Sequence, residues 1–285
     1  MQSLWMVAAS FLFACMGVCV KLGADRFSAG ELVFYRGLVA VLLMLPFIGW
    51  HRLPLATPFG RDHFWRGLSG FVSLAAFFYA ITLIPLAAAV TLNYTSPLFL
   101  ALLLVFWARE TAAPRLHLAL AAGFAGVVLV LQPTLAREQW LGGLLALASG
   151  VTSSVAYWNV RRLGELGEPE WRTVFYFSLF STLGGLPWAL AGGPFHAIDL
   201  TGGLLLAGVG GFGTAAQLCM TVAYKRGRTL TSASLAYTTV AFSSLFAFLF
   251  WGETMPAAAW AGVALIVASG IAAMAQSHAA PAGRE

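Results

Sequence analysis

The side chains of this chain that could recognise a small molecule are polar or aromatic residues placed inside long apolar stretches. Tyrosine rings combine an apolar face with a hydroxyl group, and the amides of asparagine and glutamine both donate and accept hydrogen bonds. Together they suit an amphipathic solute that is bound by stacking and hydrogen bonding. The candidate binding residues are Tyr79, Asn93, Tyr94, Tyr157, Trp158, Asn159, Gln217 and Tyr237.

Each candidate also has an ordinary structural alternative. Polar side chains within apolar helices often bond to a neighbouring helix rather than to a ligand. Trp158 fits the belt of aromatic residues that collects where a membrane meets water. Binding and helix packing therefore both remain open for these residues.

Patterns for catalysis or metal binding are absent from the apolar stretches. An intramembrane enzyme would need a nucleophile with its base, paired acids or a set of metal ligands. The histidines His51, His63, His117, His196 and His278 all fall in predicted loops or in the tail. The sequence therefore predicts a chain that is not an enzyme and has no metal and no cofactor. Without a titratable group along the path, it also predicts little or no proton coupling.

Arg36 is the one charged residue well inside a predicted membrane span. A buried cation is costly and is normally paired or in contact with water. Glu31 lies near the same end of the same span, and Arg36 is within reach of the membrane surface. We expect a structural ion pair between Glu31 and Arg36, with contact to a solute as the alternative.

Pro97 and a set of small residues are predicted to shape the helices. Proline cannot donate to the carbonyl four residues back, so Pro97 is expected to kink its helix and to act as a gating hinge. A static kink is the alternative. A ridge of small residues that allows close helix packing is expected at Gly203, Ala207, Gly211 and Ala215.

The composition identifies the element type that positions these residues. The chain is 60% hydrophobic and only 9% charged, whereas a soluble globular domain carries about 25% charged residues. Apolar runs near the length that crosses a bilayer, about 20 residues, must be helices. The predicted spans are 4–21, 30–50, 65–84, 87–108, 117–133, 140–160, 171–191, 201–224, 230–251 and 257–276.

The second half of the chain repeats the first. From Gly67 to Glu110 the repeat has a constant offset of 143 residues, and Leu92 and Tyr94 meet Leu235 and Tyr237. Upstream the offset is 141. A duplication explains this pattern, and we expect one five-helix repeat over 1–136, a second over 137–277 and a short tail over 278–285.

Lysine and arginine residues predict how the repeats are oriented. If the N-terminus is cytoplasmic, twelve of these residues lie in inside loops or the tail and only Lys21, Arg26 and Arg137 lie outside. Because each half has an odd number of spans, the two halves are expected to be inverted relative to each other. Such repeats form transporters that work by alternating access, with a binding site near the middle of the membrane. The net charge of +5 follows from this topology and indicates no nucleic-acid partner.

The order and spacing of several motifs resemble the drug/metabolite transporter superfamily, in particular its EamA-type ten-helix members. The motifs are Glu31 to Arg36, Phe78 to Ala89, Leu92 to Phe99, and the paired Glu110 and Glu253. The resemblance implies ten helices, a central cavity, both termini in the cytoplasm of a bacterial cell with the chain in its inner membrane, and transport of small metabolites, often outward.

Amino acid exporters are the nearest substrate model that the resemblance suggests. The alternative is a cationic or nucleoside-like metabolite such as S-adenosylmethionine, which aromatic residues could also bind. The expected partners are a small-molecule solute and the lipid bilayer. The apolar spans 117–133 and 257–276 are expected to face lipid or to form a homodimer contact.

Overall fold

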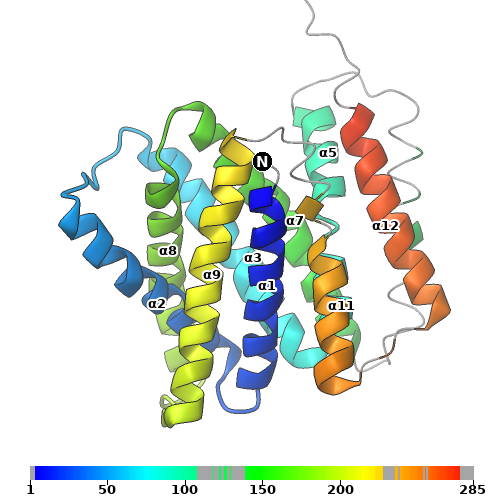
Figure 1. The fold of residues 1–285 in the computed structure, drawn as a ribbon, viewed down its shortest axis with the longest axis horizontal. Helices are drawn as coiled ribbons and strands as arrows, with labels where there is room; N and C mark the ends of the chain where they lie inside the picture. The colour runs from blue at the N-terminus through cyan, green and yellow to red at the C-terminus, as the bar shows by residue number, and fades with distance from the viewer. Residues whose placement is uncertain are drawn as a thin grey trace, which may run out of the picture.

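The computed structural model describes a bundle of α-helices (Figure 1). It describes residues 4–107, 139–226, 238–252 and 256–276, together with positions 118, 122, 125, 126, 129, 235, 236 and 254. Within these residues there is no β-strand, which confirms the prediction of an all-helical protein. The helices are α1 (Leu4–Gly23), α2 (Ala29–Trp50), α3 (Gly60–Leu83), α4 (Leu86–Asn93), α5 (Ser96–Trp107), α7 (Trp140–Glu165), α8 (Glu170–Ala191), α9 (Leu200–Arg226), α11 (Thr238–Trp251) and α12 (Ala257–Gln276).

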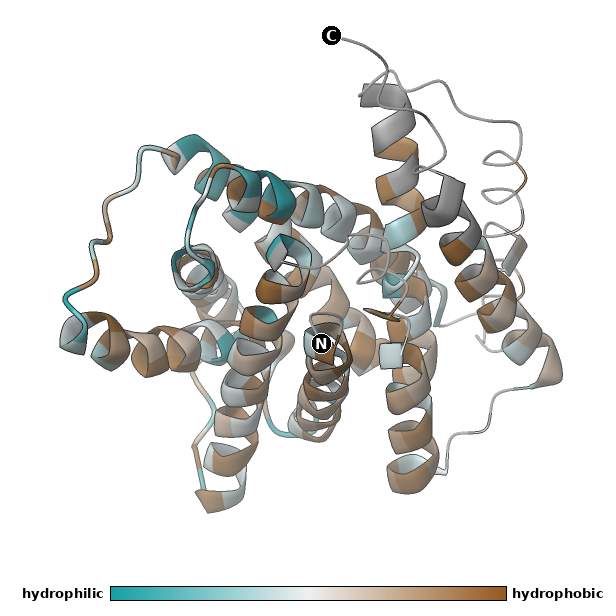
Figure 2. Cartoon of the chain, turned by 45° about the horizontal axis from the view of Figure 1, so that its top comes forward, coloured by the Kyte–Doolittle hydropathy of each residue, from teal (hydrophilic) through white to brown (hydrophobic). Residues whose placement is uncertain are grey.

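The length and composition of these helices fit a membrane. Six of them, α1, α2, α3, α7, α8 and α9, are long and apolar enough to cross a bilayer. Hydrophobic residues cover most of their length in Figure 2, and large side chains such as Leu42, Phe47 and Leu204 are exposed on their outer faces. Most of the predicted span 117–133 lies outside the described residues.

Local signals in the sequence explain where two of the helices begin. Ser28 and Glu31 form a capping box at the start of α2, with Ser28 accepting from the Glu31 N–H and Glu31 accepting from the Ser28 N–H. At the start of α9 the Asp199 carboxylate accepts from the Gly202 N–H at 2.7 Å. This backbone donor and the neighbouring Arg26 guanidinium hold the pKa of the Asp199 carboxyl below its usual range.

Helices from the two parts of the chain pack against each other. The most extensive contacts join α3 to α7, α1 to α9 and α2 to α8. Glycines permit the closest of these approaches, because a Cβ atom at Gly37 of α2 would lie 2.6 Å from the backbone nitrogen of Thr182 in α8. Pairing across the two parts places the interior of the bundle between them.

The small residues that make close contacts in α9 differ from the predicted ones. A Cβ atom at Gly211 would meet no atom within 4 Å, and Ala207 is exposed. The close contacts are instead at Gly208 beside Cys19, and at Gly210 beside Val39. The predicted ridge is therefore wrong, because regular spacing of small residues does not reveal which face of a helix is buried.

The predicted span 87–108 is two helices rather than one bent helix. Helix α4 ends at Asn93 and α5 begins at Ser96, so Pro97 is the second residue of α5. The N–H groups of Leu98 and Phe99 both bond to the carbonyl oxygen of Thr95. Proline is tolerated in the first turn of a helix, and the predicted kink at Pro97 is thus realised as a break at Tyr94 and Thr95, upstream of it.

Candidate functional site

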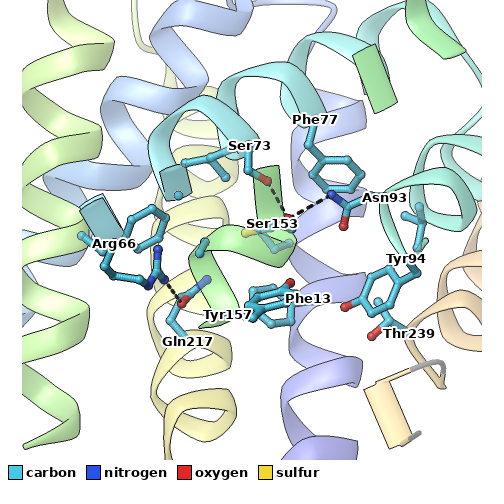
Figure 3. A pocket seen from close by; sticks show the side chains of 16 residues that line it. Phe13, Arg66, Ser73, Phe77, Asn93, Tyr94, Ser153, Tyr157, Gln217 and Thr239 are labelled. Atoms are coloured by element: carbon cyan, nitrogen blue, oxygen red, sulfur yellow. Dashed lines mark hydrogen bonds between the residues drawn. The ribbon is translucent and has the colours of Figure 1, made fainter. Parts of the chain in front are cut away.

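A cavity of about 70 Å³ lies between the two parts of the bundle (Figure 3). Seven helices and the α4–α5 break contribute to its wall, so it depends on the whole fold. Its lining residues are Phe13, Met16, Arg66, Gly70, Ser73, Leu74, Phe77, Val90, Asn93, Tyr94, Ser153, Ala156, Tyr157, Phe177, Gln217 and Thr239.

The structure brings four of the predicted binding residues together at this cavity. Asn93 and Tyr94 lie at the α4–α5 break, Tyr157 lies on α7 and Gln217 on α9. The ring of Tyr157 also stacks on the ring of Tyr224, with their centroids 5.8 Å apart. Residues from the N-terminal and the C-terminal part of the chain therefore face one cavity.

Three other predicted binding residues do not line the cavity. Tyr79 is 40% exposed and its ring meets Trp188 edge to face. Trp158 is half-buried away from the lining, and the Asn159 amide donates to the Val155 carbonyl of its own helix at 2.8 Å. Successive residues of a helix point in different directions, so Tyr157 faces inward while its two neighbours do not. Tyr237 lies outside the described residues.

Hydrogen bonds between polar side chains join α3, α4 and α7 beside the cavity. The Ser73 and Ser153 hydroxyls are 2.6 Å apart, and Ser73 also donates to the Ser149 carbonyl at 3.0 Å. The Asn93 amide donates to the hydroxyl of Ser149 on α7 at 2.8 Å and lies 3.5 Å from the Ser153 hydroxyl. Asn93 thus lines the cavity and also forms a bond between helices, which was the alternative to solute binding.

We expect Asn93 and Ser149 to be energetically coupled. Replacing either residue by alanine removes the same interhelical bond, and such bonds in membrane proteins contribute about 0.6 kcal/mol on average and at most about 1.7 kcal/mol. Thermal unfolding of Asn93→Ala, Ser149→Ala and the double variant would measure the coupling. Fully additive effects of the two substitutions would show that the bond does not form in the membrane.

Arg66 is a cavity residue whose charge counts toward the inside loops in the predicted topology, although it is also the second residue of the predicted span 65–84. Helix α3 begins at Gly60, five residues before the predicted span, and this places Arg66 within the helix, 2% exposed. Its Nη2 donates to the Gln217 Oε1 at 3.1 Å, and its guanidinium carbon lies 4.1 Å from the centroid of the Phe177 ring. Its position inside the predicted span 65–84 was the sequence signal that could have assigned Arg66 to the helix.

The predicted ion pair between Glu31 and Arg36 is not formed. The Glu31 carboxylate accepts from the backbone N–H of Ser28 and from the N–H of His196, and it lies 2.8 Å from the His196 ring nitrogen. Arg36 is 1% exposed and lies over the Phe177 ring at 4.5 Å. Helix neighbours are three or four residues apart, so a spacing of five turns the two side chains in different directions.

Buried polar contacts close one end of the bundle around Glu168. Its carboxylate accepts from the Thr57 hydroxyl and from Arg172 at 2.8 Å, and it lies 3.6 Å from His63. The Lys225 ammonium donates to the Glu168 carbonyl at 2.9 Å. His63 therefore lies buried in α3 rather than in a loop, which corrects the prediction that the spans contain no histidine.

The opposite end is joined by contacts of the Lys21 and Arg26 side chains. Lys21 donates to the carbonyls of Ile81 and Ile84 at 3.0 and 2.9 Å, where α3 ends. Arg26 forms an exposed salt bridge with Asp199 at 2.7 Å. The Arg26–Asp199 salt bridge at this end and the Thr57–Glu168 bond at the other end therefore join the two parts of the chain, with the cavity between the two ends.

Comparison with known proteins identifies the family. Residues 1–132 and 140–274 match the profile of the EamA-like transporter family. The chain belongs to this family. The resemblance found in the sequence is therefore confirmed, and this EamA-like chain is a multi-pass membrane transporter and not an enzyme.

The relatives of this EamA-like transporter have different named substrates. It is 29% identical over 266 residues to the pseudopaline exporter of Pseudomonas aeruginosa, covering 93% of each chain. It is 30% identical over 281 residues to the riboflavin transporter of Rhizobium johnstonii, covering 94% of this chain and 89% of the other. The S-adenosylmethionine uptake transporter of Rickettsia felis is 27% identical over 132 residues, which are 45% of this chain and 44% of that protein.

A solved crystal structure shares the fold of this EamA-like chain. The two superpose with a TM-score of 0.70 at 21% identity, over 95% of this chain and 96% of the other.

Proposed function

We propose that this transporter carries small amphipathic, amino-acid-like solutes by alternating access and, as its resemblance to family members implies, moves them out of the cell. The observation that carries this proposal is the cavity lined by Asn93 and Tyr94 of the first repeat and by Tyr157 and Gln217 of the second. A solute bound there would contact both repeats. Movement of one repeat against the other would then expose it to either side of the membrane.

The pairing of helices supports two inverted repeats, over 1–136 and 137–277, with the tail 278–285. Adding the offset of 141 to α1 gives residues 145–164, within α7, and adding 143 to α3 gives residues 203–226, within α9. The pair α1–α9 therefore corresponds to the pair α7–α3, while α2–α8 corresponds to itself. Contacts related in this way are what a two-fold axis between the repeats would produce.

The arrangement of the helix ends supports the proposed orientation in a bacterial inner membrane. Figure 1 places the N-terminal end of α1 and the C-terminal ends of α9 and α12 at the same end of the bundle. This end carries Arg162, Arg172 and Lys225, so by the distribution of positive charge it is the cytoplasmic end. The cluster around Glu168 then closes the cavity toward the cytoplasm.

The size and lining of the cavity bear on how a solute moves through it. Ligand pockets usually enclose about 300–1,000 Å³, so a cavity of about 70 Å³ has to widen before it can accept a solute. Among the described residues that line it, none is Asp, Glu or His. This supports solute exchange or facilitated diffusion over proton coupling, with His63 and Glu168 belonging to the closed end.

Two further roles complete the proposal. Pro97 is the second residue of α5, directly after the break, so the α4–α5 junction is the place where the outer part of this span can move as a gate. We assign the proposed homodimer contact to the predicted span 117–133 and to α12. In α12 the side chains of Trp260 and Ile271 are exposed.

Uptake into proteoliposomes tests the proposed solute class. Purified protein is offered labelled tryptophan, phenylalanine, S-adenosylmethionine and a nucleoside, each competed by the others. We expect saturable uptake of an amino acid that the other amino acids inhibit, because Tyr94 and Tyr157 suit an amphipathic zwitterion and Arg66 repels a cation. Saturable uptake of S-adenosylmethionine alone would favour the cationic alternative.

A further inference from the structure

Two buried guanidinium groups share one aromatic ring beside the cavity. The guanidinium carbons of Arg36 and Arg66 lie 4.5 and 4.1 Å from the centroid of the Phe177 ring. The two side chains are 1% and 2% exposed. Stacking on an aromatic face attracts a cation but leaves its positive charge in place, so two positive charges share the Phe177 ring.

The hydrogen-bond donors of these arginines are largely unused. Arg66 donates to Gln217 through Nη2, whereas its Nε and Nη1 and the Nε and Nη1 of Arg36 are buried and have no partner among the described residues. In the part of the chain that the structure describes, no carboxylate forms a salt bridge with either arginine. Buried charges are normally paired, and donors left unpaired in this way indicate a ligand that supplies the missing acceptors.

Glycines at equivalent positions of the two repeats make room for the arginines. A Cβ atom at Gly70 would collide with the Arg66 Nη1, and a Cβ atom at Gly213 would lie 3.3 Å from the Arg36 Nε. The two glycines are separated by the repeat offset of 143 residues. The space around both guanidinium groups is therefore built into the helices on either side of Phe177.

The position of Arg66 connects this pair to the solute path. Arg66, Phe177 and Gln217 all line the cavity, with Tyr157 on the same wall (Figure 3). Guanidinium groups bind carboxylates and phosphates through short, charge-assisted hydrogen bonds, often two at once. An anionic group entering from the cavity would meet donors that are already fixed in place.

We propose that Arg36 and Arg66 form an anion subsite that binds the oxyanion group of the transported solute. The inference rests on the proposed function and narrows its solute class to molecules that carry a carboxylate or a phosphate. Arg66 contacts the oxyanion from the cavity wall, and Arg36 supports it from behind Phe177 with its own charge. The apolar part of the solute then lies toward Phe13, Phe77 and Tyr94.

Thermal unfolding of the full chain in lipid nanodiscs tests the subsite, with succinate and inorganic phosphate as probes against chloride at equal ionic strength. Both anions bind only the folded state, so we expect a saturable rise in Tm. For Arg66→Gln, the loss of charge-assisted bonds should weaken anion binding about ten- to a hundredfold. Without anion this variant should be at least as stable as the parent, because an unpaired buried charge has been removed.

Matched variants separate the subsite from general effects of charge. Arg61→Gln makes the same change at an exposed position of the same helix, and it should keep the full Tm response. If Arg66→Gln does not fold, Arg36→Gln takes its place, and its rise in Tm with either anion should be smaller than that of the parent. A larger shift with succinate identifies a carboxylate solute, and a larger shift with phosphate a phosphate ester.

The proposal is overturned if neither anion raises the Tm more than chloride does, or if Arg66→Gln and Arg36→Gln respond like the parent. Solute counterflow in proteoliposomes is measured separately. Counterflow without an anion response would retain the transport function and reject the subsite. An anion response without movement of any solute would retain the anion site and reject the transport function.

Discussion

Gly37→Ala is expected to destabilise the folded protein strongly, whereas Gly211→Ala is expected to leave it unchanged or slightly more stable. A Cβ atom at Gly37 would lie 2.6 Å from the Thr182 backbone nitrogen and 2.9 Å from the Ser178 carbonyl oxygen. Because these are backbone atoms, helices α2 and α8 would have to separate. Overpacking of this kind costs roughly 1–3 kcal/mol, and more when the backbone has to move.

The matched variant makes the same chemical change where there is space. Nothing lies within 4 Å of a Cβ atom at Gly211, and alanine is favoured over glycine in a helix interior by about 1 kcal/mol. Thermal unfolding and the yield of monodisperse protein measure both effects. Equal Tm values for the two variants would mean that α2 and α8 do not pack as the structure describes.

Glu168→Gln is expected to open the cavity toward the cytoplasm. The substitution keeps the size of the side chain but removes the charge that pairs with Arg172, and the Glu168 side chain is 1% exposed. Breaking a buried ion pair costs about 3–5 kcal/mol, which corresponds to a shift of roughly 100- to 4,000-fold toward conformations without this contact.

A cysteine in the cavity reports this opening. In a chain with Cys15, Cys19 and Cys219 replaced by serine, Ala156→Cys places a thiol on the lining. Glu168→Gln should speed its labelling from the cytoplasmic side by a membrane-impermeant reagent. Glu165→Gln is the control, because its ion pair with Arg161 is exposed and contributes little. Identical labelling rates in both variants would argue against a closing role for Glu168.

The features of the fold that depend on long apolar runs could be predicted from the sequence. Helices such as α2 and α12 begin and end within a few residues of the predicted spans, because a bilayer requires a run of apolar residues of defined length. The break at Tyr94 and Thr95 could be predicted only as a disturbance near Pro97. Proline reveals that a helix is interrupted but not whether it bends or starts anew.

The direction of individual side chains was the part of the site that the sequence left undetermined. Tyr157 and Asn159 are both polar residues of one apolar helix, yet only Tyr157 reaches the cavity. Arg66 could not be assigned to the cavity from the sequence, because a charged residue at the end of an apolar run is equally typical of a loop and of a buried helix turn. Which carboxylate pairs with which cation depends on tertiary contacts, as His196 shows by binding Glu31.

Alternating access requires the cavity to open in turn to the two sides of the membrane. Labelling of the Ala156→Cys thiol in right-side-out and inside-out vesicles tests it most directly, with the impermeant reagent added outside in each case. We expect the thiol to be labelled from both sides. A solute that the protein transports should lower the labelling rate on each side. A thiol that reacts from neither side while transport proceeds would contradict it.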